Sequence, residues 1–347
     1  MVKSLTVSMK KKDPYIRVFF YRLINNMFFV LRSRLAWSSE LSKHKPMRQS
    51  LHTIAVLMGG VSSEREVSMA SGKAVASGLR VAGFSVVEEE ITSPDIALDS
   101  SIDLAFVALH GRFGEDGGVQ QQLLDLAIPF TGSSVVSCEN SFDKVKTRSI
   151  LRQLGVPVAS GEVLQSALER TLSLPVVVKP SREGSSMGCH IVRNEEEWHK
   201  AFEDAASFCE DVLVEEYIPG RELTVGIVGD QILPVVEISP QGDWYDFKAK
   251  YQSDKTVYQV PAELSSSISE KLQMMAWEVF NGLNAMDLAR VDFRLDPENR
   301  PFVLELNAIP GFTESSLLPK AAAAAGIPFS ELCRRIVEGA WNRHFKR

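Results

Sequence analysis

The 347-residue sequence predicts an α/β and α+β fold, in which a parallel sheet comes first and a more mixed unit follows. Apolar strand-like runs alternate with helix-like runs between about residues 53 and 154, which is the pattern of a doubly wound parallel sheet. From residue 174 the runs become shorter and several strands follow one another. The composition, 45% hydrophobic and 24% charged, is that of a globular protein and excludes a disordered or fibrous chain.

In the first part, apolar runs mark the strands and helical spacing of apolar residues marks the helices. We expect strands at residues 53–58, 84–90 and 103–109 and helices at 64–81, 119–127 and 141–154. The third helix ends where Gly155 and Pro157 interrupt the pattern.

In the second part, the segment 181–188 is a loop dense in glycine and serine, and 239–261 is a long polar loop. A second α+β unit begins at about residue 222. We expect strands at 176–179, 189–192, 212–217, 223–228, 232–238, 287–295 and 301–306, and helices at 195–206, 268–285, 320–325 and 329–341.

The first fifty residues differ in charge from the rest. They hold eleven Lys or Arg against two acidic residues, a net charge of +9, whereas the remainder holds 27 basic against 42 acidic residues, a net charge of −15. The whole-chain charge of −6 gives no electrostatic reason to expect nucleic-acid binding. The four cysteines show no C-x-x-C pair, so we expect neither a disulfide framework nor a zinc site, and a reducing compartment.

Residues 15–31 are apolar but contain two arginines and two asparagines, which makes a membrane-spanning helix costly. A basic amphipathic helix lying on a membrane surface fits the composition. A signal peptide fits poorly, because no small-residue cleavage site follows. The remaining interpretation, which we favour, is that Met47 is the true start and that the preceding segment lies outside the fold.

Two expected strands near the C-terminus carry hard oxygen ligands. Side chains alternate along a strand, so Arg290 and Asp292 share one face, as do Glu305 and Asn307 on the next strand. Two carboxylates and an amide on one surface are typical of Mg²⁺ sites that phosphate and water complete. The sharp turn at 310–313 follows directly and could present a backbone N–H to a ligand.

The segment KPSREGSSMG, residues 179–188, places Lys179 at a strand end before a Gly/Ser loop. Such a loop can cover phosphates with N–H and hydroxyl donors, although it is not a Walker A sequence. Glu215 ends a strand 36 residues later and could accept ribose hydroxyls at a domain boundary.

Two further segments could bind a substrate. His110 opens HGRFGEDG at a strand end, where open α/β sheets bind ligands. Glu64 lies at a helix N-terminus in GGVSSEREVS, where a capping role is the structural alternative. The polar loop with Lys248, Lys250 and Tyr251 is a candidate lid, with a solvated charged loop as its alternative.

Together these segments resemble the D-alanine–D-alanine ligases of the ATP-grasp superfamily. HGRFGEDG and ELNAIPGFT are similar to the two family signatures, KPSREGSSMG and KAKYQSD are also family-like, and all four occur in the family's order. The resemblance covers about residues 52–341. It implies an ATP-grasp fold with an N-terminal parallel-sheet, Rossmann-like (pre-ATP-grasp) domain. The implied division is an extension at 1–51, a D-alanine-binding domain at 52–132, a central ATP-grasp domain at 133–215 and a C-terminal ATP-grasp and metal-binding domain at 216–347.

The reaction implied by the resemblance joins two D-alanines at the expense of ATP and gives D-alanyl-D-alanine, ADP and phosphate. The carboxylate of the first D-alanine attacks the γ-phosphorus, and the amine of the second displaces phosphate from the acyl phosphate. The dipeptide feeds peptidoglycan synthesis, so the resemblance implies a bacterial cytoplasm. It also implies a homodimer and two Mg²⁺ or Mn²⁺ ions per site.

Site roles carry over residue by residue. Asp292, Glu305 and Asn307 would hold the metal ions, and Glu64 would pair with the first D-alanine's ammonium group. Arg290 and the N–H of Gly311 would form the oxyanion hole. Contacts with ATP would come from Lys144, Lys179, Ser186, Glu215, Glu216, Ile218, Glu222 and Lys250. Ser185 would act with the catalytic groups, and His110, Ser316 and Leu317 would contact the amino-acid substrates.

Two positions refine the expectation. Tyr251, directed towards Glu64 and Ser185, matches family members that use D-alanine as second substrate, whereas Phe there goes with D-lactate. Glu216 departs from the Lys that many relatives carry beside the adenine, so we expect altered nucleotide affinity with activity retained. The alternatives are another ATP-grasp carboxylate–amine ligase, such as one using D-lactate or D-serine, and a non-catalytic ATP-binding regulator.

Overall fold

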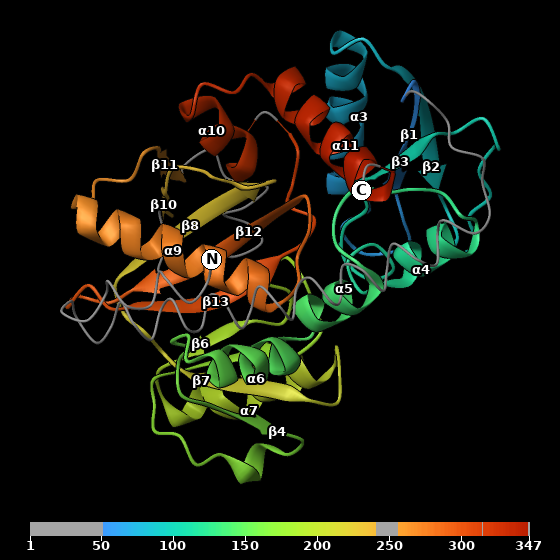
Figure 1. Ribbon diagram of the computed structural model, residues 1–347. Coiled ribbons are helices and arrows are strands. Elements are labelled where there is room, and N and C mark those ends of the chain that lie inside the picture. The colour runs from blue at the N-terminus through green and yellow to red at the C-terminus, as the bar shows by residue number, and fades with distance from the viewer. Residues whose placement is uncertain (1–50, 241–255, 314, 346–347) are drawn as a thin grey trace, which may run out of the picture. The chain divides into compact units, whose positions relative to one another are not determined.

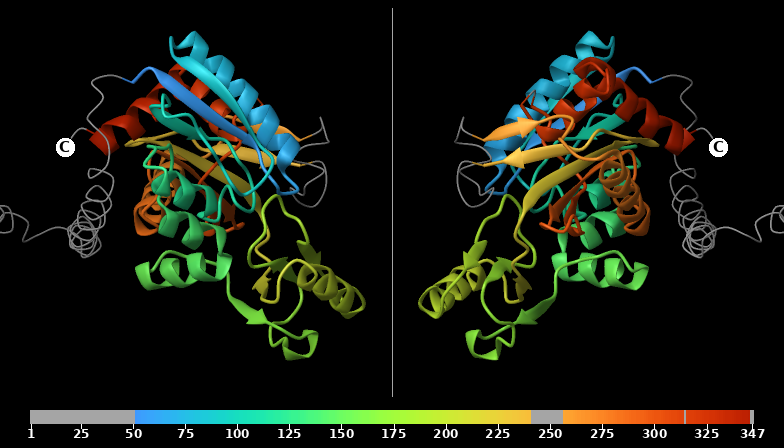
Figure 2. Two further views of the ribbon diagram at one scale, coloured as in Figure 1. Left: turned by 90° about the vertical axis from the view of Figure 1, so that its right-hand side faces the viewer. Right: turned by 90° about the vertical axis from the view of Figure 1, so that its left-hand side faces the viewer.

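Three β-sheets, formed by successive segments of the folded chain, organise the protein (Figure 1). The computed structural model describes residues 51–240, 256–313 and 315–345, all within the unit Pro46–Arg347. The second sheet and its helix lie at one end of this unit (Figure 2). The N-terminal segment with its apolar residues 15–31, and Met47, lie outside the described residues.

The first sheet is parallel throughout, as predicted, and its strand order is β2-β1-β3. Helix α3 and the C-terminal helix α11 pack together against it, so Met58, Leu79 and Ile336 share one hydrophobic cluster. Gly72 allows α3 to approach β1 closely, because a Cβ on this residue would lie 2.4 Å from the Cβ of Met58 in β1. The elements are β1 (Thr53–Gly59), α3 (Arg65–Val81), β2 (Ser85–Ile91), β3 (Leu104–Val107), α4 (Gly118–Asp125), α5 (Val135–Phe142) and α6 (Lys144–Leu154).

The second sheet is antiparallel, in the order β4-β7-β5-β6, and α7 packs against it through Trp198 and Phe202. The Gly/Ser loop joins β5 to β6, at the sheet edge. The elements are β4 (Gly161–Leu164), the 3₁₀ turn η1 (Ala167–Glu169), β5 (Val176–Pro180), β6 (His190–Val192), α7 (Glu195–Ala206) and β7 (Val212–Glu216).

The third sheet is antiparallel, in the order β11-β10-β8-β12-β13, with β9 beside β8. Alternation along β12 buries Val291 and Phe293 in the cluster formed with α9. The same alternation turns Arg290, Asp292 and Arg294 to the opposite face. The elements are β8 (Arg221–Val228), β9 (Gln231–Ile232), β10 (Val236–Ser239), β11 (Val257–Gln259), α9 (Ser266–Gly282), β12 (Leu288–Leu295), β13 (Pro301–Asn307), α10 (Leu317–Ala324) and α11 (Phe329–Phe345).

Two predicted elements are wrong in extent. The helix expected at 141–154 is α6 together with the last two residues of α5, and the rest of α5 was not predicted. The break occurs because Asp143 takes an extended conformation and its carboxylate caps α6 by accepting from the N–H groups of Val145 and Lys146. The strand expected at 232–238 is divided into β9 and β10 around Pro234, which has no N–H for a sheet. The strands β4 and β11 were not predicted.

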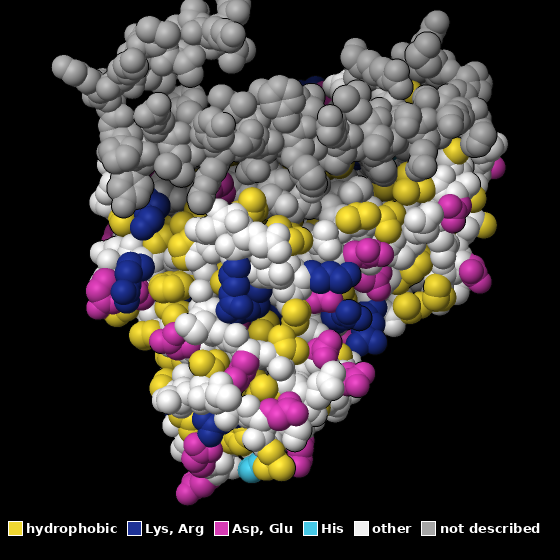
Figure 3. Space-filling view, turned by 60° about the horizontal axis from the view of Figure 1, so that its bottom comes forward, with side chains coloured by type: hydrophobic (Ala, Val, Ile, Leu, Met, Phe, Trp, Pro, Cys, Tyr) yellow, Lys and Arg dark blue, Asp and Glu magenta, His cyan; other side chains and the backbone are white. Residues whose placement is uncertain are grey.

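None of the helices among the described residues has the length and apolar character needed to cross a bilayer. On the face in Figure 3, acidic and basic side chains are interspersed.

Candidate active site

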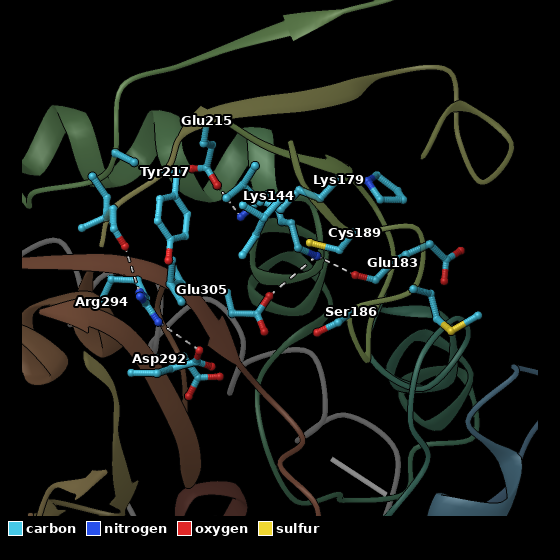
Figure 4. Close-up of a pocket in the computed structure, with 18 of the residues that line it drawn as sticks. Lys144, Lys179, Glu183, Ser186, Cys189, Glu215, Tyr217, Asp292, Arg294 and Glu305 are labelled. Carbon is cyan, nitrogen blue, oxygen red and sulfur yellow. Dashed lines mark hydrogen bonds and ion pairs between the residues drawn. The ribbon is translucent and has the colours of Figure 1, made fainter. Parts of the chain in front are cut away.

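Two adjoining pockets contain all the predicted site residues that the structure describes. The first lies between the second and third sheets (Figure 4). The second, a cleft of about 600 Å³, opens between the first sheet, the Gly/Ser loop and the turn after β13. The pockets share the residues Lys144, Glu183, Gly184, Ser185 and Glu305. A ligand in one pocket would therefore lie beside a ligand in the other.

The predicted oxygen ligands of β12 and β13 lie on one surface. Asp292 is directly opposite Glu305 in the strand register, and Arg290 is opposite Asn307. Asp292 and Glu305 both face the first pocket (Figure 4). The shared face inferred from strand alternation is thus confirmed.

The polar contacts of this surface fit a hard cation in part. The Oδ1 atom of Asn307 is buried and has no hydrogen-bond partner among the described residues, as expected of an oxygen that awaits a ligand. Asp292 accepts from Arg290 at 2.7 and 2.8 Å and from the Thr224 hydroxyl at 2.6 Å. Within the described ranges, no three His, Cys, Asp or Glu side chains cluster as a metal site. Mg²⁺ would therefore take two carboxylates and one amide, with phosphate and water completing its coordination.

Lys144 joins the two pockets. It begins α6, where Asp143 caps the helix, and its Nζ lies 2.5 Å from the Glu183 carbonyl oxygen and 3.7 Å from Oε2 of Glu305. In Figure 4 its side chain extends between Glu183 and Glu305. Its position at the shared wall suits an ammonium group that contacts a phosphate.

Glu215 is the centre of a buried ion cluster. Its two carboxylate oxygens pair with Arg148 and with Lys179, and all three side chains are nearly inaccessible. Burial lowers the pKa of Lys179 to about 8 and that of Arg148 to about 10. Arg148 was not predicted. It lies in a helix 67 positions before Glu215, and nothing in the sequence indicates that the two side chains meet. Contact of Glu215 with a ribose stays a prediction.

Glu222 and Ile218 also lie where nucleotide contacts were predicted. Arg294 donates to the Ile218 carbonyl at 3.1 Å and contacts Glu222 at 3.5 Å. Arg294 also lies 5.9 Å from the ring centre of Tyr217. Glu216 and Ser186 line the same pocket. Neither Arg294 nor Tyr217 was predicted. Arg294 is opposite Glu222 on the neighbouring strand β8, whereas its contacts with Ile218 and Tyr217, which follow β7, join residues that are distant in the sequence.

The Gly/Ser loop contacts the Glu64 carboxylate. The Ser185 hydroxyl donates to Glu64 Oε1, and a Cβ on Gly184 would lie 2.7 Å from Oε2 of the same carboxylate. Ser185 and Ser186 adopt left-handed conformations, with φ of 48° and 59°. Glu64 makes no side-chain capping bond to α3, which argues against the capping alternative. Its carboxylate instead faces the second pocket.

His110 is held from both ring nitrogens. Nδ1 lies 3.4 Å from Glu115 Oε1, and Nε2 lies 3.2 Å from the Ser71 hydroxyl. Burial raises the pKa of Glu115 to about 7, because little water remains to solvate its charge. Glu115 and Ser71 were not predicted as site residues, although Glu115 belongs to the quoted HGRFGEDG segment.

The raised pKa of Glu115 predicts a pH-dependent loss of stability. Between pH 4.5 and about 7 the folded protein keeps a proton that the unfolded chain has released, so the free energy of unfolding falls as pH rises. Glu115→Gln removes this dependence. Relative to the variant, the wild type should lose about 3 kcal/mol across this window. Urea unfolding of both proteins at a series of pH values checks this, and parallel curves would contradict it.

The turn after β13 completes the second pocket. Gly311 and Ser316 line it. The Ser316 hydroxyl is hydrogen-bonded to the Thr313 hydroxyl at 2.7 Å and accepts from the backbone N–H of Thr313 at 3.1 Å. Leu317 lines the pocket at the start of α10. The predicted lid residues Lys248, Lys250 and Tyr251 lie outside the described residues.

Comparison with known proteins gives a consistent family. The family model for the D-ala D-ala ligase C-terminus matches residues 150–338. The D-alanine–D-alanine ligase of Syntrophotalea carbinolica is 43% identical over 294 residues, covering 83% of this chain and 95% of the relative. That of Citrifermentans bemidjiense is 42% identical, with the same coverage.

Solved structures agree. The D-alanine–D-alanine ligase of Bacillus anthracis has a TM-score of 0.75 at 33% identity, covering 84% of this chain and 98% of that one. Its complex with ATP has a TM-score of 0.73 at 31% identity, with the same coverage. These matches confirm the predicted ATP-grasp fold. The chain belongs to the D-alanine–D-alanine ligase family.

Proposed function

We propose that this protein joins two D-alanines into D-alanyl-D-alanine, with conversion of ATP to ADP and phosphate, for peptidoglycan synthesis. Its relatives at about 40% identity over most of the chain are named for this activity, and a solved relative binds ATP. The observation that carries the proposal is the shared wall of the two pockets at Lys144 and Glu305. It would bring the γ-phosphate of ATP beside a carboxylate in the second pocket.

In the first step, a carboxylate oxygen of the first D-alanine attacks the γ-phosphorus and the bond to the ADP oxygen breaks. Lys144 and Lys179 would attract the phosphates, with Lys250 as a further predicted contact. Mg²⁺ or Mn²⁺, two ions held by Asp292, Glu305 and Asn307, would neutralise charge on the transferred phosphoryl group. The buried Asn307 oxygen without a partner among the described residues supports this assignment.

In the second step, the amine of the second D-alanine attacks the acyl carbon. Phosphate leaves with the electrons of the C–O bond, and the nitrogen gives up one proton to the departing phosphate or to water. Negative charge develops on the acyl oxygen, where Arg290 and the Gly311 N–H would act as donors. Glu64, buried and oriented by Ser185, would pair with the ammonium group of the first D-alanine. His110, Ser316 and Leu317 would contact the substrates. The homodimer and the cytoplasmic location stay predictions of the family resemblance.

The reaction product distinguishes this function from that of a ligase with another second substrate, such as D-lactate. With ATP and D-alanine we expect dipeptide, and with D-alanine plus D-lactate we expect more dipeptide than ester, because Tyr251 matches the peptide-forming members. L-alanine should release no phosphate above the amino-acid-free control. Mass spectrometry of the products and a phosphate assay measure this. A larger ester yield would identify a depsipeptide ligase, and phosphate release indifferent to D-alanine would contradict the function.

A further inference from the structure

Ser71 connects the two sequence motifs of the second pocket from a fully buried position in α3. Its hydroxyl accepts the backbone N–H of Phe312 at 3.1 Å and lies 3.2 Å from Nε2 of His110. Phe312 directly follows Gly311, and His110 opens HGRFGEDG. The three groups come from α3, from the end of the first sheet and from the turn after β13. One side chain thus connects both walls of the pocket.

The hydrogen bonds around Ser71 have a direction. Because Oγ accepts the Phe312 N–H, its own proton needs an acceptor, and among the described residues Nε2 of His110 is the acceptor within reach. Nε2 then carries a lone pair, and Nδ1 carries the proton that faces Glu115 Oε1 at 3.4 Å. The chain therefore runs from the Phe312 amide through Ser71 and His110 to Glu115.

The surroundings of Phe312 make this contact sensitive to position. The ring is buried and packs edge-on against Phe106 with 5.4 Å between ring centres. The ring therefore fixes the side chain, while Ser71 fixes the backbone beside Gly311. Without the hydroxyl, the buried Phe312 N–H would lack this acceptor, and the Gly311–Phe312 peptide would lose the hydrogen bond that fixes its orientation.

We propose that Ser71 is a positioning residue of the ligase site, which holds the Gly311–Phe312 backbone and the His110 ring in a fixed relation. The inference rests on the proposed function in one respect, namely that the Gly311 N–H acts on the reacting acyl group. Small displacements of such a donor reduce turnover strongly. The effect should therefore fall on kcat, while KM for ATP, which binds in the other pocket, stays nearly unchanged.

Ser68 provides the matched control. It lies one turn earlier in α3, is equally buried, and makes two hydrogen bonds, to the Ala108 carbonyl at 2.7 Å and from the Gly59 N–H at 2.9 Å. Neither partner belongs to the turn after β13. Ser68→Ala therefore removes a buried hydroxyl from the same helix without touching the Phe312 amide.

The experiment compares Ser71→Ala, Ser71→Cys and Ser68→Ala in the full chain. For Ser71→Ala we expect kcat to fall about 10- to 100-fold with KM for ATP within about twofold. Hydrogen exchange in peptides containing Phe312 should accelerate, and the ¹⁵N shifts of His110 at pH 8 should leave the Nδ1-protonated pattern. Ser71→Cys, with a weaker donor and acceptor of similar shape, should be intermediate. Ser68→Ala should keep kcat and the Phe312 exchange rate.

Equal losses of kcat in Ser71→Ala and Ser68→Ala, or unchanged exchange at Phe312 in Ser71→Ala, would overturn the proposal. If Ser71→Ala does not fold, Ser71→Cys decides by the same measurements. Wild-type protein that releases no phosphate with D-alanine would refute the proposed function instead. The exchange and ¹⁵N comparisons would then decide alone whether Ser71 holds the turn.

Discussion

Glu305→Gln is expected to lower D-alanine-dependent phosphate release by roughly a thousandfold, the scale of several kcal/mol of transition-state stabilisation. Glu305 lies opposite Asp292, lines both pockets and is 3.7 Å from the Lys144 ammonium group. The amide keeps the shape of the side chain but removes the charge that would hold the metal ion. Steady-state phosphate release at saturating ATP and D-alanine, across a Mg²⁺ titration, measures the loss.

Glu237→Gln is the control for that change. Glu237 is a carboxylate of the same sheet, paired with Arg221 at 2.5 and 2.7 Å, and it lines neither pocket. This variant should retain nearly full activity. Retention of more than about a tenth of wild-type activity by Glu305→Gln would remove Glu305 from the proposed metal set.

Glu215→Gln should lower the free energy of unfolding by about 3–5 kcal/mol, because it leaves two buried cations without their counter-ion. Both Arg148 and Lys179 depend on this carboxylate, and all three side chains are almost inaccessible. Weaker ATP binding should accompany the loss, since Lys179 faces the first pocket. Urea unfolding and nucleotide titration measure the two effects.

The matched comparison for stability is Glu195→Gln. Glu195 pairs with Arg170 at 2.5 Å, but its side chain is 70% exposed. Solvent screens such a pair, so its loss should change the free energy of unfolding by less than about 1 kcal/mol. Similar changes in both variants would show that the cluster around Glu215 contributes no more than a surface ion pair.

Much of the fold could be predicted because local patterns determine it. Strand β1 is a continuous apolar run and helix α3 has apolar residues at helical spacing. Helix α7 was predicted with its observed limits, Glu195–Ala206. The break at Asp143 was missed because an aspartate inside a helical pattern gives no sign in the sequence that its side chain caps a new helix. The short strand β4 was missed because it depends on pairing with β7, which is distant in the sequence.

The site could be predicted where its residues lie in compact motifs. Strand alternation placed Arg290, Asp292, Glu305 and Asn307 on one surface without any long-range information. Arg148 and Ser71 could not be found in this way, since each meets its partner only after separate elements come together. Arg294 shares the face of Arg290 and Asp292, but its contact with the Ile218 carbonyl, beyond the end of β7, could not be predicted from alternation. The resemblance to known ligases assigned roles to individual motif residues, but it did not identify these partners.

The central claim is that D-alanine is activated as an acyl phosphate, and oxygen transfer tests it most directly. D-alanine labelled with ¹⁸O in its carboxylate is incubated with ATP and the purified protein, and the phosphate and dipeptide are analysed by mass spectrometry. One labelled oxygen should appear in each phosphate released, in equal amount to the dipeptide. Unlabelled phosphate, or AMP in place of ADP, would contradict attack of the carboxylate on the γ-phosphorus.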